Sequence, residues 1–144
     1  MNLIMKLKFI VFLLFTVAGS ALAQKADDLI GNYRLPNDLE LEIFKDGNTY
    51  SGKIVALNGY KKGVTKDIKN PDKSKRNDDL LGMVIITNLT FSESEKKWLK
   101  GKLYGPEKGI IINLKITKLT NKKATAVGSK LILWRTFDWV KIAP

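Results

Sequence analysis

Apolar and polar residues alternate through most of this chain, and this period-two pattern limits its fold more than any other feature of the sequence. Leu39, Leu41 and Ile43 alternate with two glutamates, as in a strand that buries one face. An Asp-Gly-Asn stretch at residues 46–48 is typical of a turn, and residues 49–57 have the composition of a second strand. We therefore expect a β-hairpin in this part of the chain.

Similar strand patterns recur along the rest of the sequence, separated by short turn-like segments. They cover residues 82–91, 98–104, 110–117, 124–134 and 137–142. About eight strands spaced by roughly ten residues, with almost no helical periodicity, predict an all-β fold. The simplest arrangements are an antiparallel up-and-down barrel and a strongly curved sandwich, and closure into a barrel removes the exposed edges of the sheet.

Residues 1–23 have the pattern of a cleaved signal peptide. Lys6 and Lys8 precede an apolar run, and an Ala-Leu-Ala sequence at its end supplies the small residues that signal peptidase recognises. The run is shorter than the ~20 apolar residues of a typical membrane-spanning helix. We expect export to the periplasm or secretion, no transmembrane segment in the mature protein, and a single β-barrel domain at residues 24–144. The alternative is an uncleaved N-terminal anchor.

The composition removes several kinds of chemistry. The 144 residues include no Cys and no His, which excludes disulfides, thiol nucleophiles, Ser-His-Asp triads and the usual zinc and haem ligands. The sequence has no Gly-rich phosphate loop and no Ser-x-x-Lys motif. We expect no catalytic residue, no metal site and no cofactor, and we interpret the chain as a binding protein rather than an enzyme.

The chain is strongly basic. Lys and Arg number 25 against 14 Asp and Glu, which gives a formal net charge of +11, or about +9 without the N-terminal segment. An excess of this size attracts anionic surfaces, so an anionic envelope component or a protein partner is the alternative to a small ligand. The lysines are widely spread, however, which is also typical of a merely soluble basic surface. We do not expect nucleic-acid binding, because an exported chain without an aromatic-basic RNA-binding motif is a poor candidate.

Residues 58–80 form a long segment without strand periodicity, and loops of this length are usually functional or disordered. Its most specific motif is Asn70-Pro71-Asp72 followed by Arg76, in which Asp72 is positioned to cap a short helix. One interpretation is a rigid clamp at a pocket mouth, with Arg76 holding a carboxylate or phosphate. The other, and the more common structure, is an ordinary capped turn.

The same loop contains several oxygen-bearing side chains that invite comparison with a calcium site. They are Asp67, Asn70, Asp72, Asp78 and Asp79. Their spacing lacks the central Gly and final Glu of an EF-hand loop, and basic neighbours oppose a cation. We therefore do not predict a calcium site.

Aromatic side chains on the expected strands are candidates to line or cap a barrel interior. Filling the core is the more common role of each, but an aromatic interior can also hold a small apolar ligand. Arg135 lies among them in the sequence and is able to stack on a ring or close the barrel end. Together with the loop motif, the candidate ligand-binding residues are Tyr33, Asp72, Arg76, Tyr104, Trp134, Arg135 and Trp139.

Several of these residues belong to an ordered series of motifs. The series is Asn70-Pro71-Asp72, Arg76, Leu80-Leu81-Gly82, Trp98, Gly101-Lys102-Leu103-Tyr104, Pro106, Gly109, Arg135-Thr136 and Trp139. It resembles the exported bacterial domain-of-unknown-function family 2147 over residues 29–142, most strongly at 70–89 and 98–109. The resemblance implies a small lipocalin-like barrel, periplasmic or secreted, with no established enzymatic activity.

Three positions depart from the family's usual pattern. Asp78-Asp79 stand where Arg-Pro is usual, Gly105 stands in place of Asp, and Ile110-Ile111-Ile112 follow the Gly109 turn where an aromatic is usual. If these positions bind a ligand in the family, this chain binds it differently or does not bind it. The resulting prediction is a noncatalytic, lipocalin-like barrel for a small apolar or amphipathic ligand, with Arg76 and Arg135 holding an acidic head group.

Overall fold

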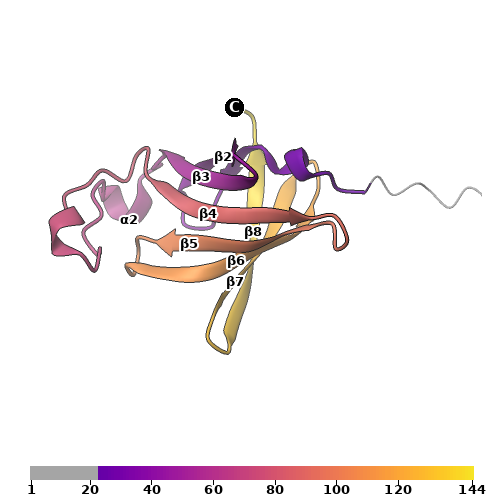
Figure 1. The fold of residues 1–144 in the computed structure, drawn as a ribbon. Coiled ribbons are helices and arrows are strands. Elements are labelled where there is room, and N and C mark those ends of the chain that lie inside the picture. Colours follow the sequence, from indigo (N-terminus) through magenta and orange to yellow (C-terminus); the bar gives the residue numbers. More distant parts are fainter. Residues whose placement is uncertain (1–22) are drawn as a thin grey trace, which may run out of the picture.

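The computed structural model describes residues 23–144, so the expected signal segment lies outside it except for Ala23. Within this part, eight strands follow one another around a closed antiparallel barrel in the order of the sequence (Figure 1). Their bounds are β1 (Gly31–Arg34), β2 (Glu40–Asp46), β3 (Thr49–Ala56), β4 (Val84–Ser92), β5 (Lys97–Gly105), β6 (Ile110–Leu119), β7 (Lys123–Lys130) and β8 (Leu133–Ile142). The topology confirms the predicted up-and-down barrel.

The alternation in the sequence decides which face of each strand is inside. In β2, Leu41 and Ile43 are fully buried, whereas Glu40 and Glu42 are partly exposed. The expected turn to β3 forms at Gly47, whose φ of 61° is a left-handed conformation that glycine adopts readily. The first hairpin is therefore confirmed.

The barrel closes where β1 pairs with β8. This seam consists of three residue pairs, whereas β7 and β8 pair over eight. The pairs are Asn32 with Ile142, Tyr33 with Lys141 and Arg34 with Val140. Because closure joins the first strand to the last, neither edge of the sheet is left open along these residues.

A short 3-10 helix, η1 (Ala26–Leu29), plugs one end of the barrel. Leu29 is fully buried there, and its carbonyl accepts a hydrogen bond of 2.8 Å from the Tyr33 hydroxyl. The indole N–H of Trp98 donates to the carbonyl of the first helical residue at 2.9 Å. The side chain of Gln24 adds hydrogen bonds to backbone groups of the β4–β5 turn and of β6. These contacts define a closed end of the barrel.

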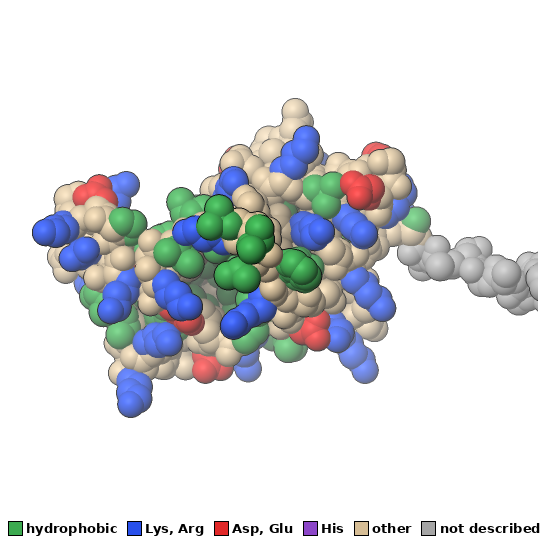
Figure 2. Space-filling model, turned by 90° about the horizontal axis from the view of Figure 1, so that it is seen from below, with side chains coloured by type: hydrophobic (Ala, Val, Ile, Leu, Met, Phe, Trp, Pro, Cys, Tyr) green, Lys and Arg blue, Asp and Glu red, His purple; other side chains and the backbone are tan. Residues whose placement is uncertain are grey.

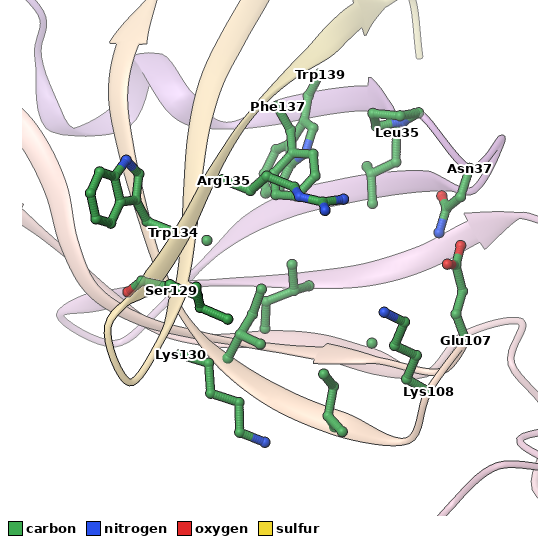
Figure 3. Close-up of a pocket in the computed structure, with 17 residues that line it drawn as sticks. Leu35, Asn37, Glu107, Lys108, Ser129, Lys130, Trp134, Arg135, Phe137 and Trp139 are labelled. Carbon is green, nitrogen blue, oxygen red and sulfur yellow. The ribbon is translucent and has the colours of Figure 1, made fainter.

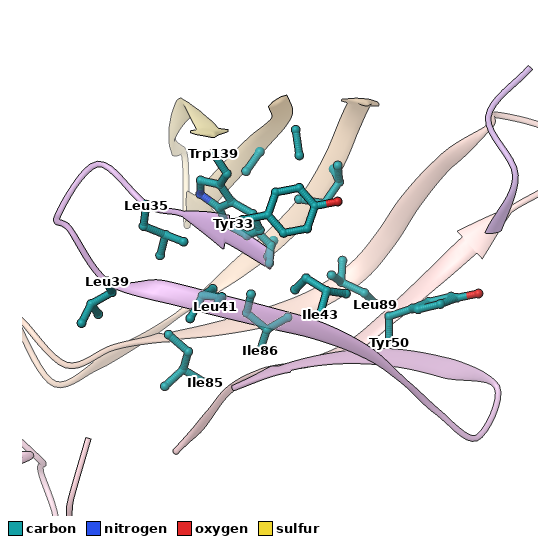
Figure 4. Packing of buried hydrophobic residues seen from close by; sticks show 14 of the residues in the cluster. Tyr33, Leu35, Leu39, Leu41, Ile43, Tyr50, Ile85, Ile86, Leu89 and Trp139 are labelled. Carbon is teal, nitrogen blue, oxygen red and sulfur yellow. The ribbon is translucent and has the colours of Figure 1, made fainter. Parts of the chain in front are cut away.

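Small inward-facing residues on β7 lie beside large inward-facing residues on β8. The register places Ala124 beside Trp139, Ala126 beside Phe137 and Gly128 beside Arg135. The small residues leave room for the large ones, so that interior side chains pack without overlap. The Trp139 ring meets that of Tyr33 edge to face, with 6.5 Å between centroids, and with the surrounding aliphatic residues fills the half of the barrel next to η1 (Figure 4).

The long segment between β3 and β4 contains two short turns, α2 (Tyr60–Gly63), in which Lys61 and Lys62 have left-handed backbone angles, and the 3-10 turn η2 (Lys73–Lys75). Asp72 caps η2 by accepting hydrogen bonds from the backbone N–H and the hydroxyl of Ser74, at 3.0 and 2.7 Å. The predicted cap is confirmed. None of the helices in residues 23–144 is both long and apolar enough to cross a membrane.

The prediction of one strand across residues 124–134 is wrong. The chain turns after β7 through two residues, and β8 already begins at Leu133. The two turn residues, Leu131 and Ile132, include no Gly, Asn, Asp or Pro that would have marked a turn in the sequence. Leu131 itself takes the positive φ, of 56°, that such turns require. Trp134 and Arg135 therefore belong to β8, on opposite faces of it.

Gly101 provides a test of the packing inside the barrel. A Cβ atom there would lie 2.6 Å from Leu89 Cδ2 and 2.9 Å from the Leu114 carbonyl oxygen, which is backbone and yields little. We expect Gly101→Ala to lower the free energy of unfolding by about 1 to 3 kcal/mol through overpacking. Urea denaturation measures this change.

The matched control is Gly105→Ala on the same strand. Its added Cβ would lie 3.7 Å from the nearest atom, an ordinary contact distance. This control should change stability by less than about 0.5 kcal/mol. Equal effects of the two substitutions would contradict the packing described for Gly101.

Candidate functional site

An open-mouthed cavity of about 700 Å³ lies at the end of the barrel opposite η1. The β1–β2 loop, the β5–β6 turn and the β7–β8 hairpin surround it (Figure 3). Its apolar lining comes mainly from Leu35, Leu103, Ile110, Ile112, Phe137 and Trp139. Trp139 also belongs to the core, so the cavity begins where the filled half of the barrel ends.

Arg135 is the charged residue that enters this cavity from β8. Its guanidinium points to the same side of the strand as Phe137 and Trp139 (Figure 3). The neighbouring inward position on β7 is Gly128, which has no side chain to obstruct it. Among residues 23–144, Arg135 forms no side-chain hydrogen bond or ion pair. Its five N–H donors are therefore available to a ligand that accepts hydrogen bonds.

The rim of the cavity is basic. Lys108 and Lys130 lie on it together with Glu107 and Asn37. The Glu107 carboxylate faces Lys61, with 3.8 Å between the charged atoms. Because the one rim acid has its own partner, the mouth carries an excess of positive charge that favours an anionic group.

Trp134 borders the mouth, but its ring lies on the other side of β8 from Arg135 (Figure 3). The side chain is 75% exposed. The alternation of a β-strand explains this placement, since neighbouring residues face opposite sides. Of the aromatic candidates, Trp139 is the one whose ring lines the cavity.

Tyr33 lies behind the cavity, in the filled half of the barrel. It is fully buried, its hydroxyl donates a hydrogen bond to the Leu29 carbonyl, and burial raises its pKa to about 12. Tyr33 supports Trp139 from behind through the edge-to-face contact. Its role here is to position a lining residue, and it is not itself part of the lining.

Asp72 and Arg76 are exposed residues of the β3–β4 loop and do not line the cavity. The hydrogen bonds from Ser74 lower the pKa of Asp72. Arg76 Nε donates to the Asn70 carbonyl at 2.8 Å. The motif thus forms a capped turn that stabilises the loop, which is the more common of the two structures considered for it.

Tyr104 fastens this loop to the barrel. Its hydroxyl lies 2.8 and 2.9 Å from the two carboxylate oxygens of Asp67, which is 1% exposed. Asn70 Nδ2 donates to the same carboxylate at 2.8 Å. Burial, followed by the hydrogen bond to Asp67, raises the pKa of Tyr104. Tyr104 of β5 and Asn70 of the loop therefore both donate to the buried carboxylate of Asp67, and this joins the loop to β5.

Gly109 allows the loop to lie directly on the β5–β6 turn. Its φ is 65°, and a Cβ atom there would lie 2.0 Å from the Lys69 carbonyl oxygen. Only a residue without a side chain permits this approach of two backbones. The loop is thus held on the β5–β6 turn, which forms part of the cavity rim.

Three of the four acidic residues of the loop are engaged by separate partners. Asp67 binds Tyr104, Asp72 binds Ser74, and Asp79 binds Lys66 with 2.6 Å between the charged atoms. Across residues 23–144, no three acidic side chains gather as they would around a metal ion.

Sequence reasoning missed several lining residues. Ile110 and Ile112 were visible only as inward-facing members of an alternating strand, and Leu103 only as part of the motif series. Nothing in a linear pattern separates an inward residue that fills the core from one that borders a cavity, because the difference depends on what lies across the barrel.

A closed antiparallel barrel, plugged at one end and opening into an apolar cavity at the other, defines a lipocalin-like barrel protein. The chain belongs to the family described as "Uncharacterized protein conserved in bacteria (DUF2147)", whose model matches residues 31–141. The resemblance identified from the motifs is therefore confirmed.

A solved structure has the same fold. It is described as "Protein HP1028 from the human pathogen Helicobacter pylori belongs to the lipocalin family", with 19% sequence identity and a TM-score of 0.71. The similarity covers 80% of this chain and 83% of that chain. No curated protein matches the sequence. At this identity the likeness concerns the fold.

Replacing Tyr104 by Phe tests the attachment of the loop. We expect Tyr104→Phe to lower the free energy of unfolding by about 1 to 3 kcal/mol, because the buried Asp67 carboxylate loses a hydrogen-bond donor. Since the pKa of Tyr104 is raised on folding, this contribution is complete below the unfolded pKa of about 10 and is lost as the pH rises further. The difference between wild type and variant should therefore narrow above pH ~10, as measured by urea denaturation across pH.

Tyr60→Phe is the control for this prediction. Tyr60 lies in the same loop and is 3% exposed, and its hydroxyl makes no side-chain hydrogen bond within the described residues. A larger loss of stability in Tyr60→Phe than in Tyr104→Phe would show that the Asp67 contact does not hold the loop.

Proposed function

We propose that this protein binds a small amphipathic ligand, with the apolar part in the cavity and an acidic group at Arg135. The observation that carries this proposal is the unpaired guanidinium of Arg135 pointing into an apolar cavity of about 700 Å³. This volume lies within the range of about 300–1,000 Å³ that is usual for small-molecule sites. A guanidinium binds carboxylate or phosphate through two parallel hydrogen bonds, which fixes the orientation of the ligand.

The ligand class follows from the two halves of the site. Phe137, Trp139 and the aliphatic residues offer an apolar wall but few polar groups that could recognise a sugar or nucleotide. The polar groups gather at the mouth, where Lys108, Lys130 and Arg135 are basic. A molecule with an apolar body and one anionic end, such as a fatty acid, matches this arrangement.

We assign the site to binding rather than catalysis. In the described part of the chain, the tyrosines with raised pKa (Tyr33, Tyr50, Tyr60 and Tyr104) all lie outside the cavity lining. Titratable groups with shifted pKa usually accompany a catalytic site. The lining is dominated instead by apolar residues and by long basic side chains at the rim.

Binding of cis-parinaric acid, a fluorescent fatty acid, tests the proposal. We expect Arg135→Gln to weaken its binding by roughly tenfold to one hundredfold, because a charge-assisted hydrogen bond of about 1.5 to 3 kcal/mol is lost. The methyl ester of the same probe should bind both proteins alike, since it has no carboxylate for Arg135. Fluorescence titration measures both affinities.

The control for net charge is Lys118→Gln. Lys118 is an exposed residue on β6 outside the cavity lining. This substitution should leave the affinity for cis-parinaric acid unchanged. If the wild-type protein fails to bind the probe, or if Arg135→Gln binds it as tightly as wild type does, the proposed role of the cavity is wrong.

We further propose that the protein is exported and works in the periplasm or outside the cell. Support comes from the basic, apolar and small-residue pattern of residues 1–23. Expression of the full sequence in a bacterial host should yield a protein that begins at Gln24, as seen by intact mass. Ala23→Arg should prevent cleavage, because the enzyme requires a small residue there. Full-length wild-type protein in the cytosolic fraction would contradict export.

A further inference from the structure

The tip of the β7–β8 hairpin is a run of four exposed apolar side chains. Leu131, Ile132, Leu133 and Trp134 are 95%, 86%, 75% and 75% exposed. Figure 1 shows that the hairpin projects well beyond the other strands, so the tip lies away from the barrel core. Single exposed apolar residues are common, but a contiguous group at a projecting point marks an interaction site.

Local conformation does not explain the presence of leucine at this turn. Leu131 and Ile132 are the two turn residues, and of these only Leu131 has a positive φ, of 56°. This is the pattern of a type II′ turn, in which the first central position favours Gly. A bulky residue in such a conformation is strained, and at 95% exposure Leu131 gains little from packing in the free protein. Contact with a partner outside the chain accounts for both the strained backbone and the exposure of Leu131.

The charges around the tip are basic. Lys130 and Arg135 flank the apolar run on the two strands, and Lys108 lies nearby on the rim of the cavity. Figure 2, which views the molecule from the side of the tip, shows hydrophobic side chains at the centre with Lys and Arg around them. Within residues 23–144, no acidic side chain forms an ion pair with Lys130 or Arg135. A partner that is apolar inside and anionic at its surface is complementary to this arrangement.

We propose that the β7–β8 hairpin inserts its tip into an anionic lipid bilayer. The leucines and isoleucine enter the acyl region, Trp134 lies at the head-group level where indoles are favoured, and Lys130 contacts anionic head groups. A second copy of the chain fits less well, because two such tips would bring like charges together. The narrow tip also offers much less area than the 1,200–2,000 Å² that stable protein interfaces usually bury.

This inference does not depend on the proposed ligand. The two are nevertheless adjacent, because Lys130, Leu133 and Arg135 belong both to the hairpin and to the cavity lining. A docked hairpin would bring the cavity mouth to the bilayer surface. Ligand binding and membrane binding are measured separately, so that failure of one does not obscure the other.

The test uses the double variant Leu131→Gly/Ile132→Ser. Glycine suits the positive φ of the turn, so the hairpin is retained while the two most exposed of its four apolar tip side chains are removed. Flotation with vesicles of phosphatidylglycerol and phosphatidylethanolamine measures binding. We expect wild type to bind these vesicles, to bind phosphatidylcholine vesicles weakly, and to dissociate as salt rises through ~0.1 to 0.5 M. The double variant should bind the anionic vesicles at least tenfold more weakly.

The chain contains its own fluorescent reporter of insertion. Of its three tryptophans, Trp98 and Trp139 are 0% and 2% exposed, whereas Trp134 is 75% exposed. Anionic vesicles should therefore shift the emission of wild type to shorter wavelength through Trp134. Trp134→Phe should still float with vesicles but lose most of the shift. A shift that persists in Trp134→Phe would place the contact elsewhere and overturn the proposal.

Val140→Ser is the matched control, since it removes an apolar side chain that is 53% exposed on β8 but distant in sequence from the tip. It should bind vesicles like wild type. Equal binding by wild type and the double variant, or no binding by wild type, would overturn the proposal. An emission shift that depends on protein concentration without vesicles, and is abolished in the double variant, would instead assign the tip to self-association. Unchanged cis-parinaric acid binding by the double variant would show that the cavity is intact.

Discussion

The width of an eight-stranded barrel is fixed by its geometry, and the volumes of the inward-facing side chains decide how much of the interior stays empty. In this protein Tyr33, Trp98 and Trp139 fill the half next to η1. Across from Trp139, Phe137 and Arg135 of β8, the inward positions of β7 hold Ala124, Ala126 and Gly128. Beyond Trp139 the opposing side chains no longer meet, and the cavity results. Core and site are therefore two halves of one interior.

The fold was predictable from the sequence because its determinants are local. Alternation of apolar residues and turn composition marks each strand, and the Asp46–Thr49 turn follows these rules. The site was not predictable in the same way. Trp134 and Arg135 are neighbours in sequence, yet only one side chain enters the cavity, and the difference depends on a turn at Leu131 that no turn-forming residue announces.

The motifs that carry the family resemblance need not mark contacts with a ligand. Asn70, Tyr104 and Gly109 belong to the motif series, and in the structure they hold the β3–β4 loop against the barrel. Buried polar groups with full hydrogen bonding specify one arrangement of a loop, since misplacing any member leaves a charge unsatisfied. These residues do not line the cavity themselves, but they hold the loop on the β5–β6 turn, which is part of its rim.

The seam between β1 and β8 also sets the order in which the molecule is completed. Synthesis proceeds from the N-terminus, so β1 is made among the first strands of the barrel and its partner is made last. Until residues 140–142 are available, β1 lacks its β8 neighbour, and the end of the barrel that η1 closes is incomplete. Contacts between such distant parts of a chain form slowly. The barrel therefore cannot close before residues 140–142 are available to pair with β1.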